Sequence, residues 1–157
     1  MTARAGLFTT GDVAAATGAS SRLQCQRWAH RIYTPSPGDT TPTGPGDDRY
    51  MTVQTVYQIG ITEETAKANV PIRVAARASA KFSEPQTNRR ASELFATGRT
   101  LLLVKPGTAE IVNAPFDATL PDVLGRPLQP ATIIDLGPIV AAVNEKLISL
   151  TKRKTRK

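Results

Sequence analysis

Cysteine and histidine are almost absent from the chain, which has one of each among 157 residues. Cys25 has no partner for an internal disulfide, and Cys25 with His30 supplies only two of the four ligands of a structural zinc site. The carboxylates of the C-terminal half are spread without a paired spacing, so general acid–base catalysis has no constellation of residues to use. We therefore expect a protein that is not an enzyme and that binds no metal or cofactor.

Long apolar segments are also absent. No apolar run exceeds five residues, the length of residues 139–143, whereas a membrane-spanning helix needs about 20 mostly apolar residues. The first eight residues lack the longer apolar stretch of a secretory signal. Together with the low cysteine content, these absences predict a cytoplasmic protein without a membrane partner.

The positive charge is concentrated at the two ends of the chain. Residues 1–90 contain 11 Lys and Arg against 7 Asp and Glu, residues 91–151 contain 4 against 6, and residues 152–157 contain 5 basic residues and no acidic one. This distribution predicts an N-terminal unit that binds a polyanion, an acidic C-terminal unit, and a basic tail that attracts phosphates. The alternative is a protein whose cationic tail is merely solvated.

Turn and cap residues predict two short helices at the start of the chain. Thr9 or Thr10 caps the first helix, which ends before Gly18, and Ser20 or Ser21 caps a second that runs to about Ile32. A glycine at a helix end followed at once by a serine cap makes a tight angle between the helices. The first 32 residues therefore predict a helix-turn-helix.

The remainder of the chain predicts loops, helices and one hairpin. Residues 34–48 include four Pro and three Gly, which predicts a loop or loose hairpin. Apolar periodicity predicts helices over residues 53–68 and 71–82, and the polar residues 83–92 predict a linker. A β-hairpin with a Pro-Gly turn follows, and then a proline-rich loop and an amphipathic helix over residues 133–150. The predicted fold class is mainly α with a small β component.

The second predicted helix separates apolar from polar side chains. On a helical wheel, one face carries Cys25, Trp28, Ala29 and Ile32. The opposite face carries Gln26, Arg27, His30 and Arg31, with Leu23 among them and Arg22 and Gln24 at its flanks. Arginine and glutamine can each form two hydrogen bonds with the edge of a base, so we expect the polar face to read a DNA groove. The alternative is an ordinary amphipathic helix that is rich in arginine.

The order of these pieces resembles the winged helix-turn-helix of the superfamily of mercury-resistance regulators (MerR) and phage excisionases. The matching segments are residues 8–14 in the first helix, 17–20 in the turn, 27–28 in the second helix, 49–52 before the third and 69–71 before the fourth. The resemblance implies that the second helix enters the major groove of double-stranded DNA, and that Arg49 approaches a phosphate or the minor groove. The DNA-binding residues it implies are Arg22, Gln24, Gln26, Arg27, His30, Arg31 and Arg49.

Two features depart from the family's pattern. The wing, residues 34–48, is long and carries Asp39, Asp47 and Asp48 where basic residues are expected. The long coiled-coil helix through which typical family activators pair is also missing, because Pro85 and the polar linker interrupt the chain.

The last predicted helix has an apolar stripe that calls for a covering surface. A hairpin and one helix make too small a core to be stable alone, so we predict a homodimer. The contact residues are Leu136, Ile139, Val140, Val143, Leu147 and Leu150. The alternative is a monomer in which the stripe covers the hairpin and the N-terminal domain.

These predictions divide the chain into four segments: a winged helix-turn-helix DNA-binding domain (residues 8–82), a linker (83–92), a hairpin-and-helix dimerisation unit (93–150) and a basic tail (151–157). The predicted function is a sequence-specific transcriptional regulator of bacterial or phage type that binds duplex DNA as a homodimer. Two alternatives stay open: an excisionase-like architectural recombination factor, and a phage packaging or assembly adaptor with a helix-turn-helix head. A contact with RNA polymerase or an integrase is also left open.

Overall fold

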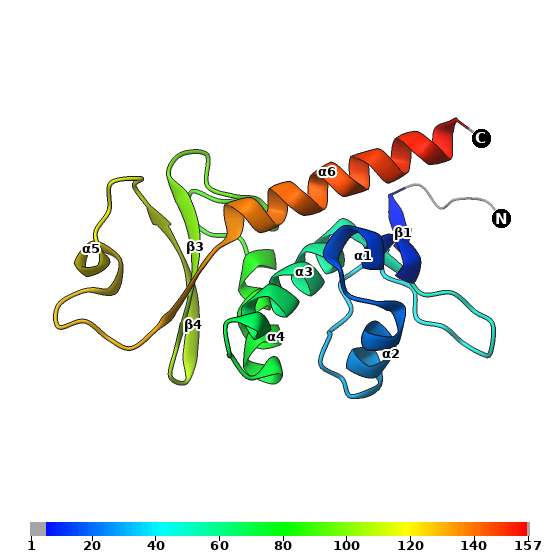
Figure 1. The fold of residues 1–157 in the computed structure, drawn as a ribbon, viewed down its shortest axis with the longest axis horizontal. Coiled ribbons are helices and arrows are strands. Elements are labelled where there is room, and N and C mark those ends of the chain that lie inside the picture. Colours follow the sequence, from blue (N-terminus) through cyan, green and yellow to red (C-terminus); the bar gives the residue numbers. More distant parts are fainter. Residues whose placement is uncertain (1–5, 157) are drawn as a thin grey trace.

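The computed structural model describes residues 6–156 and shows helices packed against two small antiparallel sheets (Figure 1). The chain is mainly α with a small β component, as predicted. In chain order the elements are β1 (Leu7–Thr9), α1 (Thr10–Thr17), α2 (Ser21–Ala29), β2 (Tyr50–Thr52), α3 (Val53–Lys67), α4 (Ile72–Ala80), a short 3₁₀ helix (Lys81–Ser83), β3 (Arg99–Lys105), β4 (Thr108–Ala114), α5 (Leu120–Leu124), β5 (Thr132–Asp135) and α6 (Leu136–Thr155). Among the described residues, no helix combines the length and the apolar character that crossing a membrane requires.

Side-chain caps define the first two helices as predicted. The Thr9 hydroxyl accepts a hydrogen bond from the Asp12 N–H (3.2 Å), and the Asp12 carboxylate accepts one from the Thr9 N–H (2.9 Å). This reciprocal capping box satisfies two N–H groups at the start of α1. Gly18 ends α1 with φ of 79°, and the Ser20 hydroxyl caps α2 by accepting from the Leu23 N–H (3.2 Å).

The end of α2 differs from the prediction. The helix ends at Ala29, because Arg31 adopts φ of 54°, a left-handed conformation that is uncommon for a residue other than glycine. The Ile32 N–H then bonds to the Arg27 carbonyl (2.8 Å), and the chain turns out of the helix.

The loop between α2 and β2 is braced by its own acidic residues. β1 and β2 pair antiparallel and close its base. The Asp39 carboxylate accepts from the Ser36 N–H (2.8 Å) and the Thr55 hydroxyl (2.6 Å), and the Asp47 carboxylate accepts from the Thr43 hydroxyl (2.6 Å). Two of the three acids that depart from the family's pattern therefore hold the loop in shape.

The C-terminal sheet includes a strand that the sequence analysis missed. β3 and β4 form the predicted hairpin, and β5 pairs with the other edge of β3, so the strand order is β4-β3-β5. The last helix therefore begins at Leu136 instead of near residue 133, and Asp135 caps it by accepting from the Gly137 N–H (3.1 Å). The β-branched residues just before this cap favour the extended conformation of β5. α5, in the proline-rich loop, was not predicted either.

α6 packs along both halves of the molecule (Figure 1). Its first half contributes Leu136 and Val140 to a core cluster with Phe82 and strands β3 and β4. Its second half contributes Val143 and Leu147 to a cluster with α1 and α3. The segments predicted as a DNA-binding domain and a separate dimerisation unit therefore share their core.

The apolar stripe that we predicted to join two copies is thus largely covered within the chain. Buried members of the stripe are Leu136, Val140, Val143 and Leu147, and partly buried members are Ile139 and Leu150. The structure has the alternative arrangement, in which the stripe covers the hairpin and the N-terminal helices. The four buried side chains cannot also contact a second copy unless α6 leaves the core, so the prediction of a dimer contact through them is wrong for this fold.

The predicted linker is an ordered part of the fold that surrounds a buried arginine. The Arg89 side chain donates hydrogen bonds to the carbonyls of Phe82 (2.9 Å), Glu84 (2.6 Å) and Glu93 (3.1 Å), and the residue is 4% exposed. Its guanidinium also lies 5.9 Å from the centre of the Phe95 ring. Segments on both sides of the predicted linker are therefore tied to one side chain.

Candidate nucleic-acid interface

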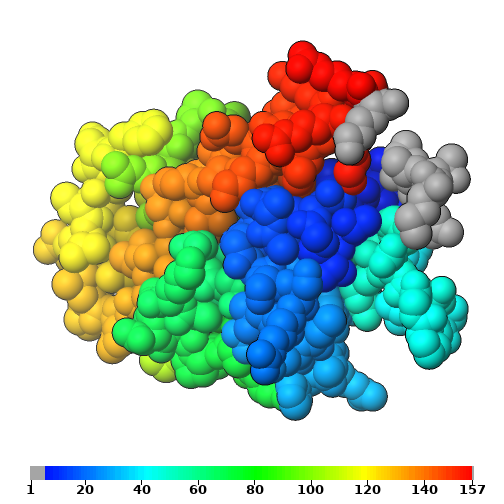
Figure 2. Space-filling view, turned by 45° about the vertical axis from the view of Figure 1, so that its right-hand side comes forward, coloured from blue at the N-terminus to red at the C-terminus, as the bar shows by residue number. Residues whose placement is uncertain are grey.

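The exposed side of α2 and the two residues after it carry four of the seven side chains predicted to bind DNA. These are Arg22, Gln26, His30 and Arg31. Figure 2 shows the blue segment of α2 at the molecular surface, below α1. Both ends of this segment are defined: Ser20 caps its start, and the left-handed conformation of Arg31 ends it.

Gln24 is a core residue, so its prediction as a DNA contact is wrong. It is fully buried, and its Nε2 donates to the carbonyls of Ala19 (2.7 Å) and Thr10 (3.0 Å). Its position at the flank of the wheel left its direction open, and the packing of α2 against α1 turns it inward. Gln24 therefore locks α2 to α1 and reads no base.

Arg27 is likewise tied to the protein. Its Nε and Nη2 donate to the two carboxylate oxygens of Glu63 on α3 (3.0 and 3.3 Å), and the Tyr33 hydroxyl donates to the same carboxylate (2.6 Å). The hydrogen bond with Glu63 raises the pKa of Arg27, and burial together with Glu63 raises the pKa of Tyr33. Arg27 therefore clamps α2 to α3, and its role as a base-reading residue stays a prediction.

The apolar face of the predicted helix is only partly buried. Trp28 is half-buried, but Cys25 and Ala29 are exposed, contrary to the helical wheel. The Arg49 guanidinium lies 4.0 Å from the centre of the Trp28 ring, and burial there lowers the pKa of Arg49. This stacking fixes Arg49, another predicted DNA-binding residue, at the point where the loop returns to the helices.

Two arginines of α4 extend the basic surface, and the sequence analysis missed both. The Arg73 Nη2 donates to the His30 carbonyl at the end of α2 (3.2 Å). Arg31, Arg73 and Arg77 line a groove of about 440 Å³ between the end of α2 and α4. Three guanidinium groups around one groove have the charge and the donors that phosphate binding requires. The spacing of Arg73 and Arg77, four residues apart on one helix face, was the signal available in the sequence.

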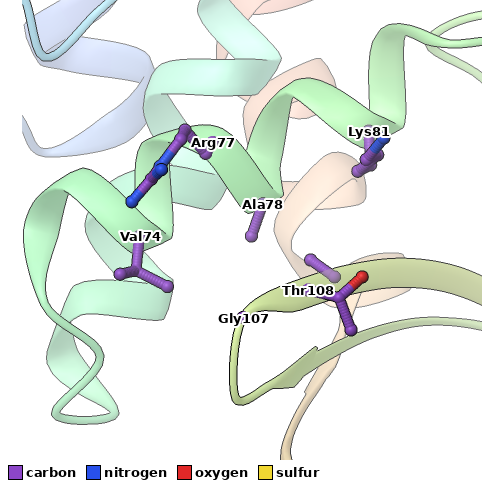
Figure 3. Close-up of a pocket in the computed structure, with 7 residues that line it drawn as sticks. Val74, Arg77, Ala78, Lys81, Gly107 and Thr108 are labelled. Atoms are coloured by element: carbon purple, nitrogen blue, oxygen red, sulfur yellow. The ribbon is translucent and has the colours of Figure 1, made fainter.

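The basic row continues along α4 toward the β3–β4 turn. Figure 3 shows Arg77 of α4 and Lys81 of the short 3₁₀ helix beside a second hollow, with Gly107 and Thr108 of the turn on its other side. This hollow has a volume of about 350 Å³, and Val74 and Ala78 give it an apolar wall. Lys81 is held by Glu84 at 3.3 Å, so its charge is partly compensated.

Together these residues form one exposed surface, which we call the α2–α4 face. It comprises Arg22, Gln26, His30, Arg31, Arg73 and Arg77. Over residues 6–156, no group of three or more His, Cys, Asp or Glu side chains is placed to hold a metal ion. The chemistry of this face is that of hydrogen-bond donors and positive charge, which suits a phosphate-rich partner.

No protein-family model and no curated protein sequence matches the chain.

Proposed function

We propose that the protein is a cytoplasmic, sequence-specific transcriptional regulator of bacterial or phage type, which binds duplex DNA through the α2–α4 face. The observation that supports the proposal is that α2 has two sets of polar side chains, one bonded within the protein and one exposed. Gln24 and Arg27 bind the helix to its own protein, while Arg22, Gln26 and Arg31 are left exposed. A helix that is rigidly held on one side and presents donors on the other suits groove recognition.

The exposed residues fall into two chemical roles. Arg22 and Gln26 lie on the same side of α2, where arginine can bond two acceptors of guanine and glutamine can bond the edge of adenine. Arg73 and Arg77 lie beside the end of α2, where they would hold phosphates of the backbone. Base contacts would set sequence preference, and phosphate contacts would set affinity and its dependence on salt.

A homodimer on an inverted repeat stays part of the proposal, because two helices bind a two-fold operator more tightly than one. Its contact needs side chains outside the buried stripe. Ile148 of α6, which is 55% exposed, is available for such a contact.

The deciding experiment is selection of bound fragments from random DNA by the purified protein, with its mass in solution measured by light scattering. We expect enrichment of one sequence. Gln26→Ala should then reduce discrimination between that sequence and random DNA by about 1–3 kcal/mol. Arg73→Ala should weaken binding to both DNAs alike and reduce the salt dependence. Arg126→Ala, an exposed arginine outside the face, is the matched control and should change neither.

Other outcomes of this experiment favour other functions. Enriched tandem sites with bent DNA would favour an architectural recombination factor. A large closed oligomer with no enriched sequence would favour a packaging or assembly adaptor. Equal loss of binding to both DNAs on Gln26→Ala would mean that Gln26 reads no base.

A further inference from the structure

The last turn of α6 carries a second cluster of cations, which we call the α6 basic turn. Its exposed members are Lys152, Arg153, Lys154 and Arg156. α6 continues to Thr155, and the hydroxyls of Thr151 and Thr155 both bond to carbonyls one turn earlier. Lys152, Arg153 and Lys154 therefore stand on the helix at set positions, and Arg156 is its C-cap residue. Residue 157 lies outside the described residues.

One of the four cations forms an ion pair with α1, and the other three lie on a different side of α6 from that ion pair. The Lys154 ammonium lies 2.7 Å from the Asp12 carboxylate at the start of α1. Helical geometry puts Lys152, Arg153 and Arg156 together on a different side of α6. Within residues 6–156, these three side chains have no ion-pair partner.

The anchoring pair is an ion pair at neutral pH. Burial by itself raises the pKa of Asp12, but the hydrogen bonds from Lys154 and Thr9 outweigh burial and leave that pKa below its usual range. Asp12 also belongs to the capping box of α1. The α6 basic turn is therefore joined to the same helix that Gln24 joins to α2.

The α6 basic turn and α2 lie on opposite sides of α1. Figure 1 shows α6 above α1 and α2 below it, and the turned view of Figure 2 keeps this order. A duplex held by the α2–α4 face would have to bend sharply around the protein to reach the turn. Bending 20–30 base pairs by 40–90° already costs roughly 1–6 kcal/mol. One short, straight duplex can therefore contact either the α2–α4 face or the α6 basic turn, but not both.

We propose that the α6 basic turn is a second phosphate-binding surface that holds a second DNA duplex, so that one protein molecule bridges two DNA segments. The inference rests on the proposed function, because the first duplex is the one on the α2–α4 face. The alternative role for the turn is to offset the negative end of the α6 dipole. That role stabilises the helix but captures no DNA, and so the two roles are separable by experiment.

The test is capture of a second duplex. A duplex carrying the selected site is fixed to beads, loaded with the full-length protein and washed, and a labelled duplex of random sequence is added. Wild-type protein should retain the labelled duplex. The triple variant Lys152→Gln, Arg153→Gln, Arg156→Gln should retain at least about tenfold less labelled duplex than the wild type, because three phosphate contacts are removed. Its affinity for the site duplex should match that of the control.

The control variant removes the same charge elsewhere: Lys105→Gln, Arg126→Gln and Lys146→Gln lie outside both surfaces. It should capture the second duplex as wild type does. Capture that survives in the α6 triple variant, or that falls equally in both triple variants, overturns the inference. So does a wild-type protein that binds the site duplex but captures no second one. A wild type that binds no DNA at all overturns the proposed function instead.

Discussion

Polar side chains on α2 have different roles according to where their hydrogen-bond partners lie. Gln24 has two backbone carbonyls within reach of one amide nitrogen, and Arg27 has a carboxylate on the neighbouring helix. Hydrogen bonds of this kind offset much of the cost of burying a polar group. Arg22 and Gln26, on the same helix, have water around them instead and remain available to a partner.

At the residue scale, we predict that Gln24→Ala destabilises the protein by about 2–4 kcal/mol. The substitution leaves a cavity in the core and removes the donor that two buried carbonyls share. Gln26→Ala, two residues away and exposed, should change the free energy of unfolding by no more than about 0.5 kcal/mol. Urea unfolding followed by circular dichroism measures both. An unchanged unfolding midpoint for Gln24→Ala would show that Gln24 does not hold α2 to α1.

At the scale of elements, the segment between α4 and β3 takes its shape from a side chain and not from regular secondary structure. Arg89 donates hydrogen bonds to carbonyls of three residues that lie between α4 and β3. Its planar guanidinium holds five N–H donors in a fixed fork that spans several acceptors, whereas the ammonium of lysine is a compact group with three donors.

We therefore predict that Arg89→Met costs about 3 kcal/mol of stability, and that Arg89→Lys recovers only part of it. Amide hydrogen exchange should show faster exchange over residues 84–95 than in the wild type. Arg90→Met, at the exposed neighbouring position, is the control and should leave both quantities unchanged. Full stability of Arg89→Lys would mean that charge alone, without the fork, orders this segment.

At the scale of the whole molecule, α6 makes one folding unit out of two segments. It supplies buried side chains both to the cluster with α1 and α3 and to the cluster with β3 and β4. Gly60 of α3 shows how closely the helices approach, because a Cβ added there would lie 3.3 Å from a methyl group of Val143. Independent domains joined by a linker would show no such shared packing.

We predict that the chain unfolds in one cooperative transition and that a fragment of residues 1–135 does not fold. That fragment lacks the side chains that cover Phe82 and Val13. The matched fragment of residues 1–150 keeps the four buried side chains of α6 but lacks Lys154, which pairs with Asp12. Its free energy of unfolding should therefore fall by only about 0–1 kcal/mol. Trp28 fluorescence during urea unfolding follows both. A cooperative transition in residues 1–135 would restore the two-domain interpretation.

The sequence by itself determined the features that depend on neighbouring residues. Gly18 and Ser20 set the turn between the first helices, the Pro-Gly pair set the hairpin, and proline and glycine kept residues 34–48 irregular. Caps and turns are governed by the conformational preferences and hydrogen bonds of a few adjacent residues, so their effects are visible without the fold. The α6 basic turn is equally visible as a run of charge.

The tertiary structure alone decided which polar side chains face outward and which segments share a core. The partner of Arg27 is Glu63, 36 residues further along, and the partner of the His30 carbonyl is Arg73, 43 residues away. Such pairs form only when helices pack against each other. A helical wheel groups side chains by face, but it does not show which face another helix covers. For the same reason, the stripe of α6 favoured a second copy when judged from the sequence, whereas in the structure the chain's own helices and hairpin cover it.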